Sequence, residues 1–208
     1  MATTTPLLPD PLAPHLREVT VSGDTLYQGH FLQLRRDHVR LPGGALATRE
    51  YVLHPGAVMV IPLLDDGRVV LERQFRYPVG RVMVEFPAGK LDPGETSWHC
   101  AQRELLEETG YTAREWARAG QLHPVIAYAN EFIDIWFARG LVAGVQNLDP
   151  GELVDVFAAT PEALLQGCRD GEVTDAKTLT GALWLQNVLS GAWPLDWQTV
   201  PSSSHEGS

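Results

Sequence analysis

The sequence predicts an α/β fold in which helices cover both faces of a mixed β-sheet, with a separate β-strand region before it. Runs rich in β-branched and aromatic residues recur along the chain, and two of them flank Asp65-Asp66-Gly67 as in a hairpin. Segments with helical periodicity and capping residues lie between and after these runs. That combination is typical of a helix–sheet–helix sandwich. With 208 residues and 44% hydrophobic content, the chain can bury one sizeable core.

The chain divides into four stretches. Residues 1–16 are rich in Pro and Thr and are expected to be disordered, residues 17–53 form the N-terminal β region, residues 54–192 the main domain, and residues 193–208 a flexible tail. The expected strands are Glu18–Ser22, Phe31–Leu34, Ala47–Leu53, Val58–Leu64, Val69–Arg73, Phe132–Ala138 and Val154–Ala158. Two later helices are expected, from Pro161 to about Cys168 after the N-cap Thr160, and from Lys177 to about Leu189.

The most informative segment lies between Gly89 and Tyr111 and contains a further helix. At about 3.6 residues per turn, Glu104, Glu107 and Glu108 fall on one face of that helix. The neighbouring apolar positions recur at helical spacing and can pack against a core; they are Trp98, Ala101 and Leu105. Gly110 stands where a left-handed C-terminal cap is expected.

Three carboxylates on one helical face repel one another. At a separation of about 4 Å near a surface, the repulsion reaches roughly 4 kcal/mol per pair before screening. Arg103 is the one cation within the helical segment. A solvated acidic face is one interpretation of such a pattern. The other is a site for hard divalent cations, since Mg²⁺ is held by a few carboxylates together with substrate phosphates.

Composition excludes several classes of function. The formal net charge is −10, which argues against binding to nucleic acid because phosphate backbones attract clustered Lys and Arg. The longest apolar run, Gly56 to Leu64, is far shorter than the roughly 20 residues that span a bilayer. Two cysteines, Cys100 and Cys168, do not make a disulfide framework, so we expect a reducing, cytoplasmic setting.

The spacing of this segment resembles the Nudix box, G-x5-E-x7-R-E-U-x-E-E-x-G-U, in which U is a bulky apolar residue. The matching residues are Gly89, Glu95, Arg103, Glu104, Leu105, Glu107, Glu108 and Gly110, and Tyr111 takes the last position as a departure from an aliphatic residue. The resemblance implies a Nudix-type α/β/α sandwich and hydrolysis of a diphosphate linked to another moiety. It also implies Mg²⁺ as the cofactor, for which Mn²⁺ can substitute.

Outside the box, the sequence is similar to the ADP-ribose pyrophosphatase branch of that family. The likeness is carried by residues 54–64, 72–80, 85–95, 123–136 and 171–179. It implies hydrolysis of ADP-ribose to AMP and ribose 5-phosphate. Two alternatives stay open: hydrolysis of another nucleoside-diphosphate sugar, such as a GDP-sugar or ADP-glucose, and a non-catalytic sensor that binds ADP-ribose.

The resemblance implies roles for individual residues of the box. The backbone carbonyl of Ala88 and the carboxylates of Glu104 and Glu108 would bind metal, with Glu107 on a further ion or its water shell. Arg103 would orient a glutamate within the box; Glu95 is the expected partner and would clamp the loop. The general base would come from a later loop, where Glu152 is the matching residue; Glu131 and Asp155 are the competing candidates.

Substrate contacts are implied in the same way. Arg76 matches a phosphate-binding arginine, and Arg49 with Glu50 matches a pair near the adenine. His30 stands where the branch places an aromatic ring that stacks on adenine from a second subunit. The resemblance therefore implies a homodimer with exchanged N-terminal strands, acting on a small nucleoside diphosphate.

Overall fold

The computed structural model describes residues 13–200, which form two compact units. The first contains the chain up to His54 together with Val125–Asn130, and the second contains Pro55–Pro124 and the chain from Glu131 onward. The disorder expected for the first residues of the chain falls largely on residues 1–12, which lie outside the described part. No helix within residues 13–200 is long and apolar enough to cross a bilayer.

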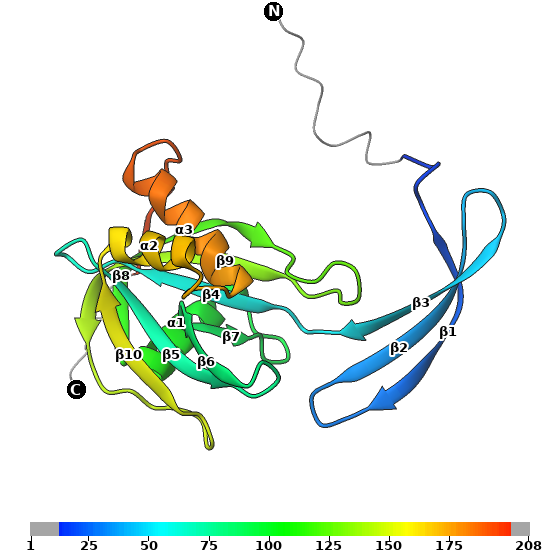
Figure 1. The fold of residues 1–208 in the computed structure, drawn as a ribbon, viewed down its shortest axis with the longest axis horizontal. Coiled ribbons are helices and arrows are strands. Elements are labelled where there is room, and N and C mark those ends of the chain that lie inside the picture. The colour runs from blue at the N-terminus through cyan, green and yellow to red at the C-terminus, as the bar shows by residue number, and fades with distance from the viewer. Residues whose placement is uncertain (1–12, 201–208) are drawn as a thin grey trace, which may run out of the picture. The chain divides into compact units, whose positions relative to one another are not determined.

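The first unit is a three-stranded antiparallel sheet in the order β1-β2-β3 (Figure 1). Its strands are β1 (Val19–Gln28), β2 (Gln33–Arg40) and β3 (Leu46–Leu53). β1 runs further than expected. Of the strand expected from Phe31 to Leu34, the first two residues belong to the turn before β2 and the last two begin β2. Every residue of β1 is exposed, including the apolar Val19, Val21 and Leu26.

The second unit contains a five-stranded sheet in the order β11-β8-β9-β4-β7 and a three-stranded sheet in the order β10-β5-β6 (Figure 1). The strands are β4 (Ala57–Pro62), β5 (Val69–Arg76), β6 (Arg81–Glu85), β7 (Ala88–Lys90), β8 (Tyr111–Leu122), β9 (Ile133–Ala143), β10 (Val154–Ala159) and β11 (Gln198–Thr199). The helices are α1 (Ser97–Thr109), α2 (Pro161–Asp170) and α3 (Ala176–Leu189). β4 and β9 pair in parallel while β4 and β7 pair antiparallel, so the larger sheet is mixed.

Alternation along β4 separates two hydrophobic clusters. Val58 and Val60 are buried in the cluster that contains Ala101 and Leu105 of α1. The residues between and after them, Met59 and Ile61, are buried in the cluster that contains Ala182 and Leu185 of α3. Because successive side chains of a strand point to opposite faces, α1 and α3 cover opposite faces of this sheet. The α/β/α sandwich predicted from the sequence is confirmed.

Four strands of the second unit were not expected from the sequence: β6, β7, β8 and β11. β11 lies within residues 193–208, the stretch assigned to a flexible tail. Its residues Gln198 and Thr199 pair with Trp116 and Glu115 of β8, so this part of the stretch is paired with the sheet. Residues 201–208 lie outside the described part.

Candidate active site

α1 is fixed at both ends by the caps that its sequence provides. The Thr96 side chain accepts a hydrogen bond from the His99 N–H at 3.3 Å. Gly110 has φ 73° and donates its N–H to the Leu106 carbonyl, as expected of a left-handed cap. On the apolar side, Trp98 contacts Trp116 and Trp136 edge-on. This anchoring determines which way the glutamates of α1 point.

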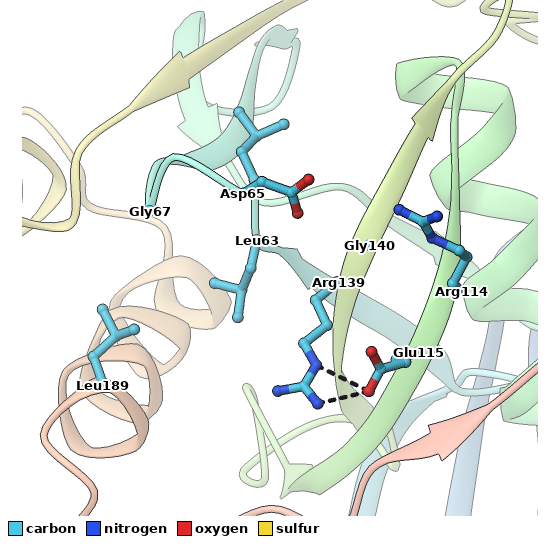
Figure 2. A pocket seen from close by; sticks show the side chains of 9 residues that line it. Leu63, Asp65, Gly67, Arg114, Glu115, Arg139, Gly140 and Leu189 are labelled. Carbon is cyan, nitrogen blue, oxygen red and sulfur yellow. Dashed lines mark hydrogen bonds and ion pairs between the residues drawn. The ribbon is translucent and has the colours of Figure 1, made fainter.

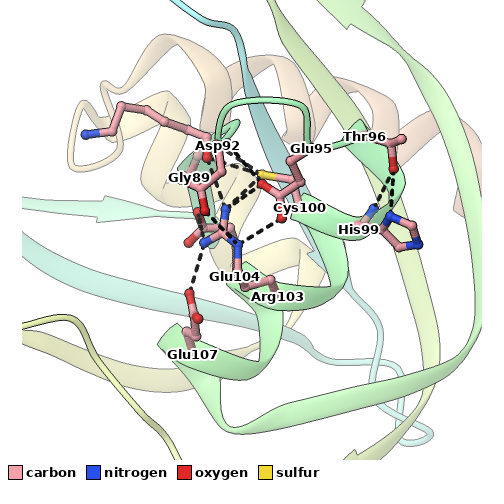
Figure 3. A network of polar contacts seen from close by, with 10 residues as sticks. Gly89, Asp92, Glu95, Thr96, His99, Cys100, Arg103, Glu104 and Glu107 are labelled. Carbon is pink, nitrogen blue, oxygen red and sulfur yellow. Dashed lines mark hydrogen bonds and ion pairs between the residues drawn. The ribbon is translucent and has the colours of Figure 1, made fainter. Parts of the chain in front are cut away.

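Arg103 connects the loop before α1 to the glutamates on the helix (Figure 3). Its Nε and Nη2 donate to the two carboxylate oxygens of Glu95 at 3.0 and 2.9 Å, which is the contact expected from the sequence. Its Nη1 also donates to Glu104 at 2.8 Å and to Glu107 at 3.0 Å, two contacts that were not expected. The hydrogen bonds from Arg103 lower the pKa of Glu95 to about 2. The acidic face is therefore partly neutralised from within the helix.

Glu104 lies against the backbone of Gly89. A Cβ at position 89 would stand 1.8 Å from the Cδ of Glu104, so any side chain there would displace the carboxylate. Burial raises the pKa of Glu104 to about 7, against the opposing charge of Arg103. Glycine at position 89 is required by this close approach.

Glu108 is the most deeply buried glutamate of α1, at 3% exposed. Its Oε2 accepts a hydrogen bond from the Ala88 N–H at 2.9 Å, which brings the backbone of Ala88 beside the carboxylate. Burial raises the pKa of Glu108, and the charges of Glu72 and Glu104 raise it further. A buried group of this kind gains from a cation that replaces the lost hydration.

The donor set fits a hard divalent cation. It offers carboxylate oxygens from Glu104 and Glu108 and the carbonyl of Ala88, the ligand types that Mg²⁺ prefers. Within residues 13–200, no three His, Cys, Asp or Glu side chains are gathered into a metal-ligand cluster. The predicted ligands have other partners here, since Glu104 and Glu107 bond Arg103 and Glu108 bonds Ala88.

The structure brings Glu152 into the electrostatic environment of these glutamates. It lies in a turn in which its N–H donates to the Asp149 carbonyl at 3.0 Å. Its negative charge contributes to the raised pKa values of Glu104 and Glu108. The competing candidate Asp155 is exposed on β10 and pairs with Arg73.

Arg76, the predicted phosphate ligand, is bonded within the protein. Its Nε and Nη2 donate to the two oxygens of Glu85 at 2.7 and 2.8 Å. Lys177 donates to the same carboxylate and to Asp175. Burial acts to raise the pKa of Glu85, but Arg76 and Lys177 outweigh it and hold that pKa below its ordinary value. Arg76 keeps 40% of its side chain exposed and can reach a ligand from this anchor.

The three residues predicted to lie near an adenine all belong to the first unit. Arg49 forms a two-point ion pair with Glu18, and Glu50 accepts from Arg36 at 2.8 Å. His30 is exposed in the turn between β1 and β2. Arg49 and Glu50 are consecutive on β3 and therefore point to opposite faces of its sheet.

Sequence reasoning missed three charged residues of the second unit: Glu72, Glu85 and Lys177. All three are buried. The available signal was a glutamate directly after the apolar run Val69–Leu71, a position where a buried strand residue is expected. A single sequence gives no indication of which such glutamate is buried.

A surface pocket elsewhere in this unit does not contain these residues (Figure 2). It is lined by residues of the β4–β5 turn, β8, β9 and the end of α3, among them Leu63, Arg114, Arg139 and Leu189. Its Arg139 is engaged with Glu115 at 2.6 Å. The pocket shares no residue with the predicted site.

Comparison with known proteins agrees with this geometry. Residues 53–180 match the NUDIX domain family, and residues 18–52 match the nucleoside diphosphate sugar hydrolase N-terminal domain. The chain is 38% identical over 173 residues to a protein of Bacillus subtilis named ADP-ribose pyrophosphatase, covering 82% of this chain and 94% of that one. It is 41% identical over 188 residues to a Mycobacterium tuberculosis protein of the same name, covering 87% and 90%. A crystal structure of an ADP compounds hydrolase superposes with a TM-score of 0.76 at 20% identity, covering 85% of this chain and 97% of that one. The chain belongs to the Nudix hydrolase family.

Proposed function

We propose that this protein hydrolyses the diphosphate bond of ADP-ribose, giving AMP and ribose 5-phosphate, with Mg²⁺ as its cofactor and Mn²⁺ as a substitute. One structural observation carries the proposal. Two buried carboxylates lie against β7, the strand before α1, that of Glu104 against the backbone of Gly89 and that of Glu108 against the N–H of Ala88. The names of the two bacterial relatives support ADP-ribose as the substrate.

Glu104, Glu108 and the carbonyl of Ala88 would hold the cation, with Glu107 on a second ion or its water. A bound divalent cation neutralises charge on the diphosphate and lowers the pKa of a bound water. Arg103 holds the loop before α1 against the helix by bonding Glu95. Three other residues of the box would have structural roles. Gly89 leaves space for the Glu104 carboxylate, Glu95 clamps the loop through Arg103, and Gly110 caps the helix.

Glu152 is our candidate for the general base. A carboxylate within reach of an attacking water can take its proton. The position of Glu152 in a turn, with its charge acting on Glu104 and Glu108, supports this role. Arg76 would bind the diphosphate, since a guanidinium fork suits paired phosphate oxygens.

Adenine recognition would fall to Arg49, Glu50 and His30, with His30 supplied by a second subunit. A group of exposed apolar side chains marks an interaction surface. β1 is exposed along its whole length and carries several exposed apolar side chains, which supports a homodimer assembled through the N-terminal sheet. The buried Cys100 and the partly buried Cys168 are both free thiols, which supports a reducing, cytoplasmic setting.

The test is a hydrolysis panel of ADP-ribose, ADP-glucose and GDP-mannose with Mg²⁺, in which a phosphatase releases phosphate from the products. A preference of about tenfold or more for ADP-ribose in kcat/KM supports the proposal. Equal turnover of all three would leave a general nucleoside-diphosphate-sugar hydrolase. Binding of ADP-ribose without turnover of any substrate would indicate a sensor.

A further inference from the structure

One face of β5 carries buried polar atoms that no other described residue bonds. Within residues 13–200, four buried side-chain atoms lack a hydrogen-bond partner, and three of them are both carboxylate oxygens of Glu72 and Oε1 of Gln74. Glu72 is 0% exposed. Burial raises the pKa of Glu72 to about 7, so the charged carboxylate is costly without a partner, and a positively charged ligand would remove this cost.

Alternation along β5 shows which way these atoms face. Val69 and Leu71 are buried in the hydrophobic cluster shared with α3. Glu72, Gln74 and Arg76 occupy the alternate positions and therefore face the other side of their sheet. The unpaired oxygens thus share a face with the predicted phosphate ligand.

The two cationic side chains that attract Glu72, those of Arg76 and Lys177, are bonded to a different carboxylate, that of Glu85. Glu85 pairs directly with Glu72 across β5 and β6. Arg76 and Lys177 both bond Glu85, at 2.7 Å in the case of Arg76. Glu72 therefore receives attraction from these cations without a bond from either.

Glu72 also acts on the carboxylate of Glu108 in α1. Its charge follows burial as the next cause of the raised pKa of Glu108. Glu152 repels both Glu72 and Glu108. The charges of the strand glutamate Glu72, the helix glutamate Glu108 and the loop glutamate Glu152 therefore act on one another, and Glu72 is fully buried and unbonded.

We propose that Glu72 is an additional carboxylate ligand of the divalent cation held by Glu104 and Glu108. This inference rests on the proposed function, because it concerns the same cation. Octahedral cations such as Mg²⁺ and Mn²⁺ take oxygen ligands from several directions. A ligand on β5 would link the three-stranded sheet to α1 through the cation.

The direct test is a titration of the full-length protein with Mn²⁺ in the absence of nucleotide, followed by calorimetry. Glu72→Gln keeps the size of the side chain and removes its charge. Glu115→Gln is the matched control, since it removes the same charge from a glutamate bonded to Arg139. We expect Glu72→Gln to weaken Mn²⁺ binding by about tenfold or more, with Glu115→Gln unchanged.

Melting temperature supplies a second readout that does not depend on turnover. In EDTA, Glu72→Gln should melt above the wild type because one unpaired buried charge is gone. Addition of Mn²⁺ should then raise its melting temperature less than that of the wild type. Glu72→Val, a residue suited to a strand, should behave alike and provides the test if the glutamine variant fails to fold.

Two outcomes would overturn the inference, and they are distinguishable. If Glu72→Gln binds Mn²⁺ as the wild type does while Glu108→Gln does not, Glu72 is no ligand and the proposed function stands. If the wild type itself takes up no Mn²⁺, both the ligand role of Glu72 and the metal-dependent function are wrong.

Discussion

The carboxylate of Glu104 occupies the space that a side chain at Gly89 would need, with Cδ only 1.8 Å from the position of the missing Cβ. This relationship joins β7 to α1 at the point where the proposed cation would bind. This contact explains why position 89 requires glycine: a side chain there would clash with Glu104. Backbone conformation is not the cause, since Gly89 is not among the glycines with positive φ.

Gly89→Ala should therefore fold but displace Glu104. We expect kcat/KM for ADP-ribose to fall by about a hundredfold, because a shift of this size misplaces a ligand. Gly43→Ala is the control, since a Cβ there meets nothing within 4 Å and its φ is also not positive. Normal turnover by Gly89→Ala would show that activity does not depend on the position of the Glu104 carboxylate.

Glu108→Gln should lower the activity of the protein while raising the stability of its metal-free form. The amide can still accept the bond from the Ala88 N–H, but the buried negative charge is removed. We expect turnover to fall by about a hundredfold or more and the melting temperature in EDTA to rise. Circular dichroism checks the fold. A variant that melts lower and turns over normally would contradict the ligand role.

The stability of the metal-free protein should depend on pH through Glu104. Its pKa is about 7 in the folded protein against 4.5 ordinarily, so the folded state holds this proton more tightly than the unfolded state. Stability from this group is present below the ordinary value and is lost as pH rises through about 7. Urea unfolding in EDTA should therefore show a falling free energy of unfolding between about pH 5 and pH 7.5.

Two controls accompany the pH series. Glu104→Gln should reduce the slope without removing it, because the pKa values of Glu72 and Glu108 are also raised. Mn²⁺ should reduce the slope of the wild type, because cation binding competes with the proton. Glu95 does not interfere, since its pKa of about 2 confines its own contribution to more acidic conditions. A slope that is the same in Glu104→Gln would assign the effect to other groups.

Arg103→Lys tests whether the guanidinium fork is required. Lysine keeps the charge but cannot form the two-point bond to Glu95 together with the bonds to Glu104 and Glu107, as Arg103 does. We expect a loss of about 1–3 kcal/mol in the free energy of unfolding, measured with urea. Arg118→Lys, at a more exposed arginine that bonds Asp134, is the comparison and should lose less.

The proposed homodimer predicts the result of a deletion. Removal of residues 1–45 takes away β1 and β2, and with them the exposed apolar strand. We expect monomers without activity by size-exclusion chromatography with light scattering and by phosphate release. A fully active monomer would exclude exchanged N-terminal strands as part of the site.

Several features of the second unit could be predicted from short stretches of the sequence. The caps Thr160 and Gly110 are found where side-chain chemistry and glycine placement put them. The turn between β4 and β5 was also predicted, but the expected hairpin pairing was wrong: the two strands belong to different sheets, and only the single bridge Leu63–Val69 joins them. β8 was missed because its sequence, rich in Ala and Arg, has no clear strand period; it forms because most of its length pairs with β9.

The sequence by itself determined which residues share a face of α1, because helical geometry converts spacing directly into direction. It also identified the family through the Nudix box. Tertiary structure alone decided that Arg103 bonds three glutamates, that Glu108 lies beside the backbone of Ala88, and that Glu72 is buried without a bond. Burial and charge coupling arise from contacts between distant segments of the chain, and the order of residues along one segment does not specify them.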